Sequence, residues 1–168
     1  MKKNYFENIK TLEDLKKAYK KLVLELHPDA NKEKDTTKEF IEMKKQYEEK
    51  FEKVKNTFIN SQGEYYEKEN NETPQEFADI IDKIINLKDV KIEIIGTWIW
   101  LTGNTKEYKD YLKELHFNWS KDKVAWYYHT EPFRKRSKKL KNMDELRTLF
   151  ETTEIKRNGG KVQLALSM

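Results

Sequence analysis

The chain has 168 residues and a net charge of +4, enough sequence for one compact domain or two small ones. Charged residues make up 38% of it and aromatic residues 12%, which favours long exposed helices with aromatic cores over disorder. The absence of cysteine excludes disulfides and cysteine-based zinc sites. No apolar run reaches the length of a membrane span, so we expect a cytoplasmic protein without a membrane partner.

The first predicted helix follows Thr11 and ends at His27. Thr11 is a favourable N-cap, with Asp14 three residues later in a capping-box-like pattern. Pro28 ends the helix, because the residue before a proline is driven out of helical geometry. The apolar residues recur at steps of three and four and form one stripe: Leu12, Leu15, Tyr19, Leu22 and Leu26.

A second amphipathic helix is predicted about ten residues later. Its stripe consists of Phe40, Met43, Tyr47, Phe51, Val54 and Phe58. Two helices with matching stripes and a short polar turn predict an antiparallel helical hairpin. Away from the first stripe lie four lysines: Lys16, Lys17, Lys20 and Lys21. They are either an ordinary solvated face or a positive field that steers an acidic partner.

This segment resembles the J-domain of DnaJ-type co-chaperones over about residues 4–58. The resemblance rests on Tyr5-Phe6-Glu7, Leu15, Ala18-Tyr19, Leu22, His27-Pro28-Asp29, Asn31, Phe40 and Tyr47. It implies a domain that binds a DnaK-type ATPase chaperone and stimulates its ATP hydrolysis. The implied partner-binding residues are His27, Pro28, Asp29 and Asn31 with Lys16, Lys17, Lys20 and Lys21. The blander alternative is that His27 only ends a helix and Asp29 only forms a turn.

Three departures from the family pattern indicate a divergent, dedicated co-chaperone. Ala30 stands where an arginine usually follows the tripeptide, and Gln46 stands where the second helix usually carries a small alanine. Asn8-Ile9-Lys10 replaces the usual Leu-Gly. The zinc-binding and Gly/Phe-rich regions of full-length DnaJ-type proteins have no counterpart, since the chain has no cysteine and five glycines.

An acidic, polar segment separates the hairpin from the rest. Residues 61–89 carry 3 basic and 8 acidic side chains, a net charge of −5. We predict an all-α J-domain at residues 1–60, a linker at 61–73 and a small α+β domain at 74–168.

In the second domain the apolar period alternates between helix and strand. Thr73 with Glu76 starts a helix, Gly96 turns a hairpin, and Asn104 and Asn142 are predicted helix N-caps. The predicted elements are a helix from residue 73, strands at 90–94 and 98–101, a helix to 115, strands at 117–119 and 124–128, a helix at 143–150, and a possible hairpin around Asn158-Gly159-Gly160.

Part of this domain is similar to a small module of bacterial J-domain proteins, often on mobile elements, that brings no established activity. The similarity rests on Gly96, Trp98, Trp100, Gly103, Thr105, Leu112-Lys113, Phe117, Trp119-Ser120, Lys123 and Trp126-Tyr127. Its four tryptophans are either core or a stacking platform for bases or an apolar peptide. A basic run is either a solvated loop or a contact surface for nucleic acid or client: Arg134, Lys135, Arg136, Lys138, Lys139 and Lys141.

Two hypotheses follow. The first is a co-chaperone whose hairpin recruits a DnaK-type chaperone while the second domain selects an unknown client or a location. The second is a nucleic-acid-binding accessory protein of a phage, plasmid or conjugative element. His116 and His129 lack partners at metal-ligand spacing, and no nucleophile-base pair or phosphate-binding loop is evident. We therefore expect no metal, no cofactor and no enzymatic activity.

Overall fold

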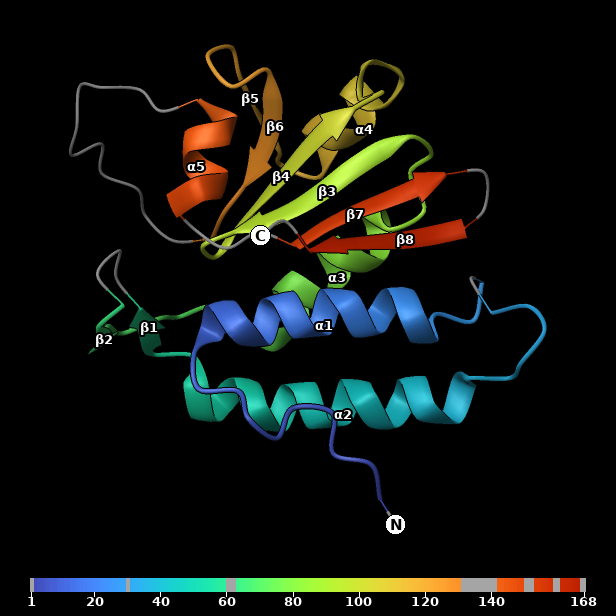
Figure 1. The fold of residues 1–168 in the computed structure, drawn as a ribbon, viewed down its shortest axis with the longest axis vertical. Helices are drawn as coiled ribbons and strands as arrows, with labels where there is room; N and C mark the ends of the chain where they lie inside the picture. Colours follow the sequence, from blue (N-terminus) through green and yellow to red (C-terminus); the bar gives the residue numbers. More distant parts are fainter. Residues whose placement is uncertain are drawn as a thin grey trace. The chain divides into compact units, whose positions relative to one another are not determined.

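A computed structural model describes residues 2–29, 31–59, 63–130, 142–149, 153–158 and 161–166 (Figure 1). The chain divides into two compact units, Met1–Ile85 and Asn86–Met168. Among the described residues no helix is both long and apolar enough to cross a membrane. The predicted fold class, a helical hairpin followed by a small α+β domain, is confirmed.

The first unit is built on two helices that lie side by side, α1 (Leu12–Leu26) and α2 (Thr37–Val54) (Figure 1). Thr11 caps α1 by accepting a hydrogen bond from the Asp14 amide. The apolar stripes meet in an aromatic core, where the ring centroids of Tyr19 and Tyr47 are 4.1 Å apart. The predicted hairpin is therefore confirmed.

The stripes end differently from the prediction. Phe58 lies on a strand because α2 ends at Val54, and that strand, β1 (Thr57–Ile59), pairs with β2 (Tyr65–Glu67). In α1, Val23 is fully buried while Leu22 and Leu26 are half-buried. A β-ladder thus occupies part of the segment that was predicted to be a linker.

The first unit also contains α3 (Pro74–Ile84), so the predicted boundary after residue 73 falls inside this unit. Thr73 and Glu76 form the predicted capping box. The apolar stripe of α3 is buried, with Phe77 lying 6.1 Å from Tyr19 between ring centroids. The contact between Phe77 and Tyr19 thus joins α3 to the helical hairpin.

The second unit contains a six-stranded antiparallel sheet in the order β5-β6-β4-β3-β7-β8. Its elements are β3 (Val90–Ile95), β4 (Trp98–Gly103), a 3₁₀ turn (Lys106–Tyr108), α4 (Lys109–Glu114), β5 (Asn118–Ser120), β6 (Ala125–Tyr128), α5 (Met143–Leu149), β7 (Thr153–Asn158) and β8 (Lys161–Leu166). The three predicted hairpins are confirmed, and together they form one sheet.

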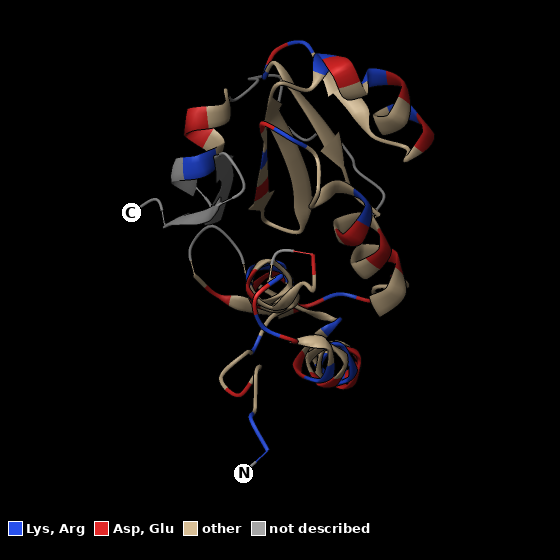
Figure 2. Cartoon of the chain, turned by 90° about the vertical axis from the view of Figure 1, so that its right-hand side faces the viewer, with Lys and Arg blue, Asp and Glu red and all other residues tan. Residues whose placement is uncertain are grey.

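Helix α5 is attached to one face of this sheet by an ion pair between Arg147 and Glu93. The Arg147 guanidinium donates from Nε and Nη2 to the two carboxylate oxygens of Glu93, each at 2.8 Å. Glu93 is fully buried, and the hydrogen bonds to it raise the pKa of Arg147. In Figure 2, the blue and red segments that mark charged residues are most frequent on the helices, while the strands drawn in tan carry few of them.

One predicted cap is wrong. Asn104 does not cap the helix that follows, whose N-cap position is Thr105. The Asn104 amide instead donates to the Asp89 carbonyl at 3.0 Å and closes the open end of the β3–β4 hairpin. A Cβ on Gly103 would approach that same carbonyl oxygen to 2.6 Å, and Gly103 has a φ of +92°, so this turn requires glycine.

Candidate functional site

The tripeptide lies where α1 ends. His27 is the C-cap, and its amide donates to the Val23 carbonyl at 2.8 Å before the backbone becomes extended. The His27 ring packs edge-on against Phe40 of α2, with 5.6 Å between ring centroids. One side chain thus joins the end of the first helix to the second helix.

The two polar residues of the tripeptide are linked to each other but differ in exposure. The Asp29 amide donates to His27 Nδ1 at 3.2 Å, and the Asp29 carboxylate lies 3.8 Å from the same nitrogen. Nδ1 accepts a hydrogen bond, so the proton of the neutral ring belongs on Nε2. The His27 side chain is 18% exposed and that of Asp29 is 71% exposed, so the carboxylate points to solvent.

Two side chains hold the loop around the tripeptide. The Asn31 amide group donates to the carbonyls of Glu25 at 2.7 Å and His27 at 3.1 Å. The Thr36 hydroxyl donates to the Leu26 carbonyl at 2.7 Å. These bonds satisfy carbonyls that the end of a helix leaves without partners. Sequence reasoning missed Thr36, whose only signal was a hydroxyl just before the second helix.

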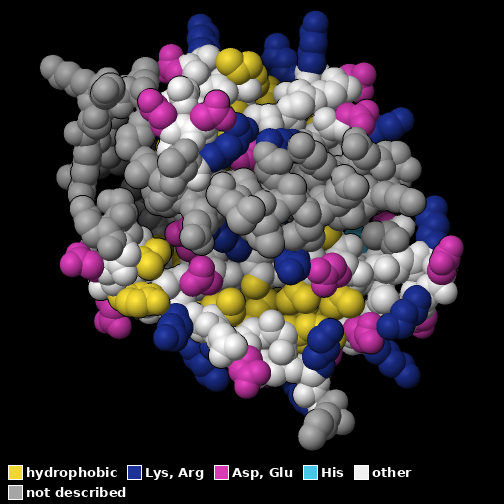
Figure 3. Space-filling model, viewed as in Figure 1, with side chains coloured by type: hydrophobic (Ala, Val, Ile, Leu, Met, Phe, Trp, Pro, Cys, Tyr) yellow, Lys and Arg dark blue, Asp and Glu magenta, His cyan; other side chains and the backbone are white. Residues whose placement is uncertain are grey.

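The structure divides the four lysines of α1. Lys16 and Lys20 are buried, Lys17 is half-buried and pairs with Glu13 at 2.7 Å, and Lys21 is exposed. Solvent exposure of all four, which the helical wheel predicted, is therefore wrong for Lys16 and Lys20. Figure 3 shows cationic and anionic side chains interspersed over one face of the molecule rather than segregated.

The burial of Lys16 has an identified cause. Its ammonium donates to both carboxylate oxygens of Glu72, at 2.9 and 2.8 Å. Sequence reasoning missed Glu72 because it lies 56 residues further on, in a segment with the composition of a linker.

Gln46 has a specific structural role. Its side-chain oxygen accepts from the Tyr5 amide at 3.0 Å, and its nitrogen donates to the Lys3 carbonyl at 2.8 Å and to Glu42 at 2.9 Å. The residue that replaces a small alanine in the family pattern thus attaches the N-terminal segment to α2.

In the second unit the tryptophans divide between core and surface. Trp100 and Trp126 are buried, Trp98 is half-buried against His129 with 4.1 Å between ring centroids, and Trp119 is 43% exposed. The predicted basic contact residues, Arg134 to Lys141, lie outside the described residues. Within the part of the chain that the structure describes, no three His, Cys, Asp or Glu residues are grouped to hold a metal ion.

Comparison with known proteins agrees with this geometry. Residues 6–49 match the DnaJ domain family. Three curated relatives, each called chaperone protein DnaJ, are 44% identical over 52 residues: those of Geobacillus stearothermophilus, Geobacillus sp. (strain WCH70) and Parageobacillus thermoglucosidasius. No solved structure matches.

Residues 6–49 are thus a DnaJ domain, with the His-Pro-Asp tripeptide in the loop between its two helices. The similarity covers 28% of this chain and 14% of each relative, so the chain matches about a seventh of the length of those proteins. Helix α3 and the sheet of the second unit lie outside the matched residues.

Proposed function

We propose that this chain is a co-chaperone that binds a DnaK-type chaperone through its DnaJ domain and stimulates ATP hydrolysis by that partner. The observation that supports it best is the position of His27-Pro28-Asp29 at the tip of the α1–α2 hairpin, inside the matched domain. The tip is held by internal hydrogen bonds, and its carboxylate faces solvent.

The chain contributes recognition rather than catalysis. The exposed Asp29 carboxylate suits a guanidinium on the partner, since charge-assisted bidentate pairs are the strong ones. The exposed Lys21 supplies positive charge that steers an acidic surface toward the tip. The partner then hydrolyses ATP faster because the docked loop favours its hydrolysing state, which is a coupling between two sites.

The test is single-turnover ATP hydrolysis by a DnaK-type chaperone with the intact chain and with His27→Gln. Glutamine cannot reproduce both the Nδ1 acceptor and the ring contact with Phe40, so stimulation is expected to be lost. The same substitution at the exposed His116 is the matched control and should leave stimulation unchanged. Equal stimulation by the intact chain and His27→Gln would overturn the proposal.

We further propose that the second unit selects a client or a location. Its support is the exposed Trp119 on the edge strand β5, a residue type that often anchors protein contacts. The test compares the intact chain with Trp119→Ala. It measures their binding to single-stranded DNA, single-stranded RNA and an unfolded model protein, at low and at near-physiological salt. Salt-sensitive binding to nucleic acid alone would favour the accessory-protein alternative.

A further inference from the structure

The ammonium of Lys16 is already occupied by a carboxylate of the same chain. Lys16 and Glu72 face each other over 2.8–2.9 Å, and each side chain is only 2% exposed. The domain resemblance places Lys16 among the cations that an acidic partner would meet. In this structure an intramolecular carboxylate takes that place.

Helix α3 covers the same site with an apolar ring. The Lys16 ammonium lies 4.9 Å from the centroid of Phe77, and Phe77 is 1% exposed. Phe77 also contacts the Tyr19 ring of α1. The surface of α1 around Lys16 and Tyr19 is therefore covered from one side by Glu72 and Phe77.

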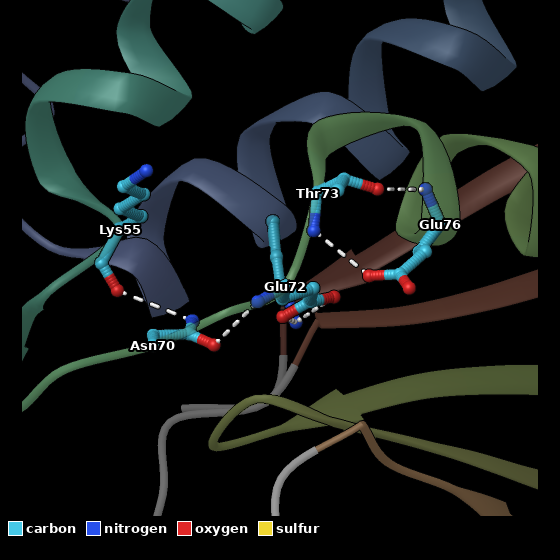
Figure 4. Close-up of polar contacts among 6 residues, drawn as sticks. Lys55, Asn70, Glu72, Thr73 and Glu76 are labelled. Carbon is cyan, nitrogen blue, oxygen red and sulfur yellow. Dashed lines mark hydrogen bonds and ion pairs between the residues drawn. The ribbon is translucent and has the colours of Figure 1, made fainter.

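The chain before α3 fixes the position of Glu72, as Figure 4 shows. The Asn70 side chain donates to the Lys55 carbonyl at 3.2 Å and accepts from the Glu72 amide at 3.0 Å. The Thr73–Glu76 capping box follows immediately. The Glu72 carboxylate is thus held between a buried asparagine and a well-formed helix start.

Two further polar contacts join α3 to α2 and are weaker. Lys44 pairs with Asp82 at 3.1 Å, and Gln75 donates to Glu48 at 3.3 Å, both in partly or fully exposed positions. Exposed pairs of this kind contribute little to stability. Of these three contacts with the hairpin, the buried pair of Glu72 and Lys16 is therefore the strongest.

We propose that residues 70–85, here called the α3 latch, autoinhibit the DnaJ domain. The α3 latch occupies the Lys16 surface of α1, and a DnaK-type partner has to displace it to dock fully. This inference rests on the proposed function, since it concerns the same docking surface. A partner that needs the open form binds with an affinity reduced by the fraction of molecules that are open.

The experiment measures ATP hydrolysis by a DnaK-type chaperone against the concentration of the intact chain, of Glu72→Gln and of Phe77→Ala. Both variants weaken the α3 latch, so the half-stimulating concentration should fall by about tenfold or more. Glu69→Gln is the matched control, because it removes the same charge from an exposed position three residues away. It should stimulate like the intact chain.

Adding His27→Gln to Glu72→Gln separates the two proposals. Loss of stimulation in the double variant, together with a lowered half-stimulating concentration in Glu72→Gln, supports both. Identical concentration dependence for the intact chain, Glu72→Gln and Phe77→Ala overturns the α3 latch and leaves the proposed function standing. Failure of every version to stimulate overturns the proposed function and the α3 latch with it.

A second measurement needs no variant and so does not depend on how the substitutions fold. Amide hydrogen exchange of the intact chain is followed with and without the ATP-bound chaperone. Opening of the α3 latch predicts faster exchange of the α3 amides, while the core amides of α2 stay protected. Full protection of α3 in a complex that hydrolyses ATP faster would overturn the α3 latch.

Discussion

At the scale of single residues, two tyrosines of the helical core bury their hydroxyls at a cost in folding free energy. The hydroxyls of Tyr19 and Tyr47 are buried without a hydrogen-bond partner in the described part of the chain. A buried polar atom without a partner destabilises the folded state. We predict that Tyr47→Phe keeps or raises the free energy of unfolding by up to about 1 kcal/mol, as measured by urea denaturation. A clear loss of stability would show that the hydroxyl is hydrogen bonded.

The same burial makes stability depend on high pH. Burial raises the pKa of Tyr47 in the folded state, while the unfolded residue titrates near its ordinary value of about 10. The folded state therefore holds a proton that the unfolded state releases, and stability falls as the pH rises above about 10. Tyr47→Phe should lose less stability than the intact chain between pH 9 and about 11. Parallel pH profiles would contradict this.

The sequence alone predicted that the tripeptide ends the first helix, but it did not predict the partners of the buried charges. The position of His27 follows from Pro28 next to it, which is a local effect. A charged residue in an amphipathic helix or strand is expected at the surface, so the sequence gives no sign that Lys16 and Glu93 are buried. Their partners, Glu72 and Arg147, are more than fifty residues away in sequence, and no local pattern encodes such a pair.

At the scale of elements, the β5–β6 turn contains a strained residue. Val124 has a φ of +51° and is 68% exposed, so a β-branched side chain adopts a left-handed conformation without gaining burial. We predict that Val124→Asn raises the free energy of unfolding by about 1 kcal/mol, because asparagine tolerates this conformation. Val124→Thr keeps the branch and should gain nothing. A gain from threonine equal to that from asparagine would assign the effect to polarity.

Caps and periodicity predicted most elements, because each depends on neighbours in sequence. The boxes at Thr73 and Asn142 and the strand alternation after Val90 are of this kind. The joining of the hairpins into one sheet was not predicted. The β3–β7 ladder pairs Ile92 with Ile155, and pairing over such a separation is decided by packing rather than by local propensity.

At the scale of the whole molecule, the division after Ile85 has consequences for stability. The acidic composition of residues 61–73 suggested that the helical domain would be complete without α3. The structure shows Phe77 at 1% exposure, in contact with the Tyr19 ring and the Lys16 ammonium of α1, so a hairpin without α3 would lose these contacts. Composition cannot reveal this, since the apolar stripe of α3 fits either neighbour equally well on sequence grounds.

We therefore predict that a fragment of residues 1–85 unfolds cooperatively and that a fragment of residues 1–73 melts at least about 10 °C lower. Burial of one large apolar side chain contributes about 1.5–3 kcal/mol, and each kcal/mol shifts Tm by about 4–8 °C in a domain of this size. Thermal melts followed by helical circular dichroism measure the difference. The control is Lys83→Ala in the 1–85 fragment, an exposed position on the same helix. If the two fragments melted together, α3 would contribute nothing to the hairpin, and the cost of opening the α3 latch would be too small to restrain docking.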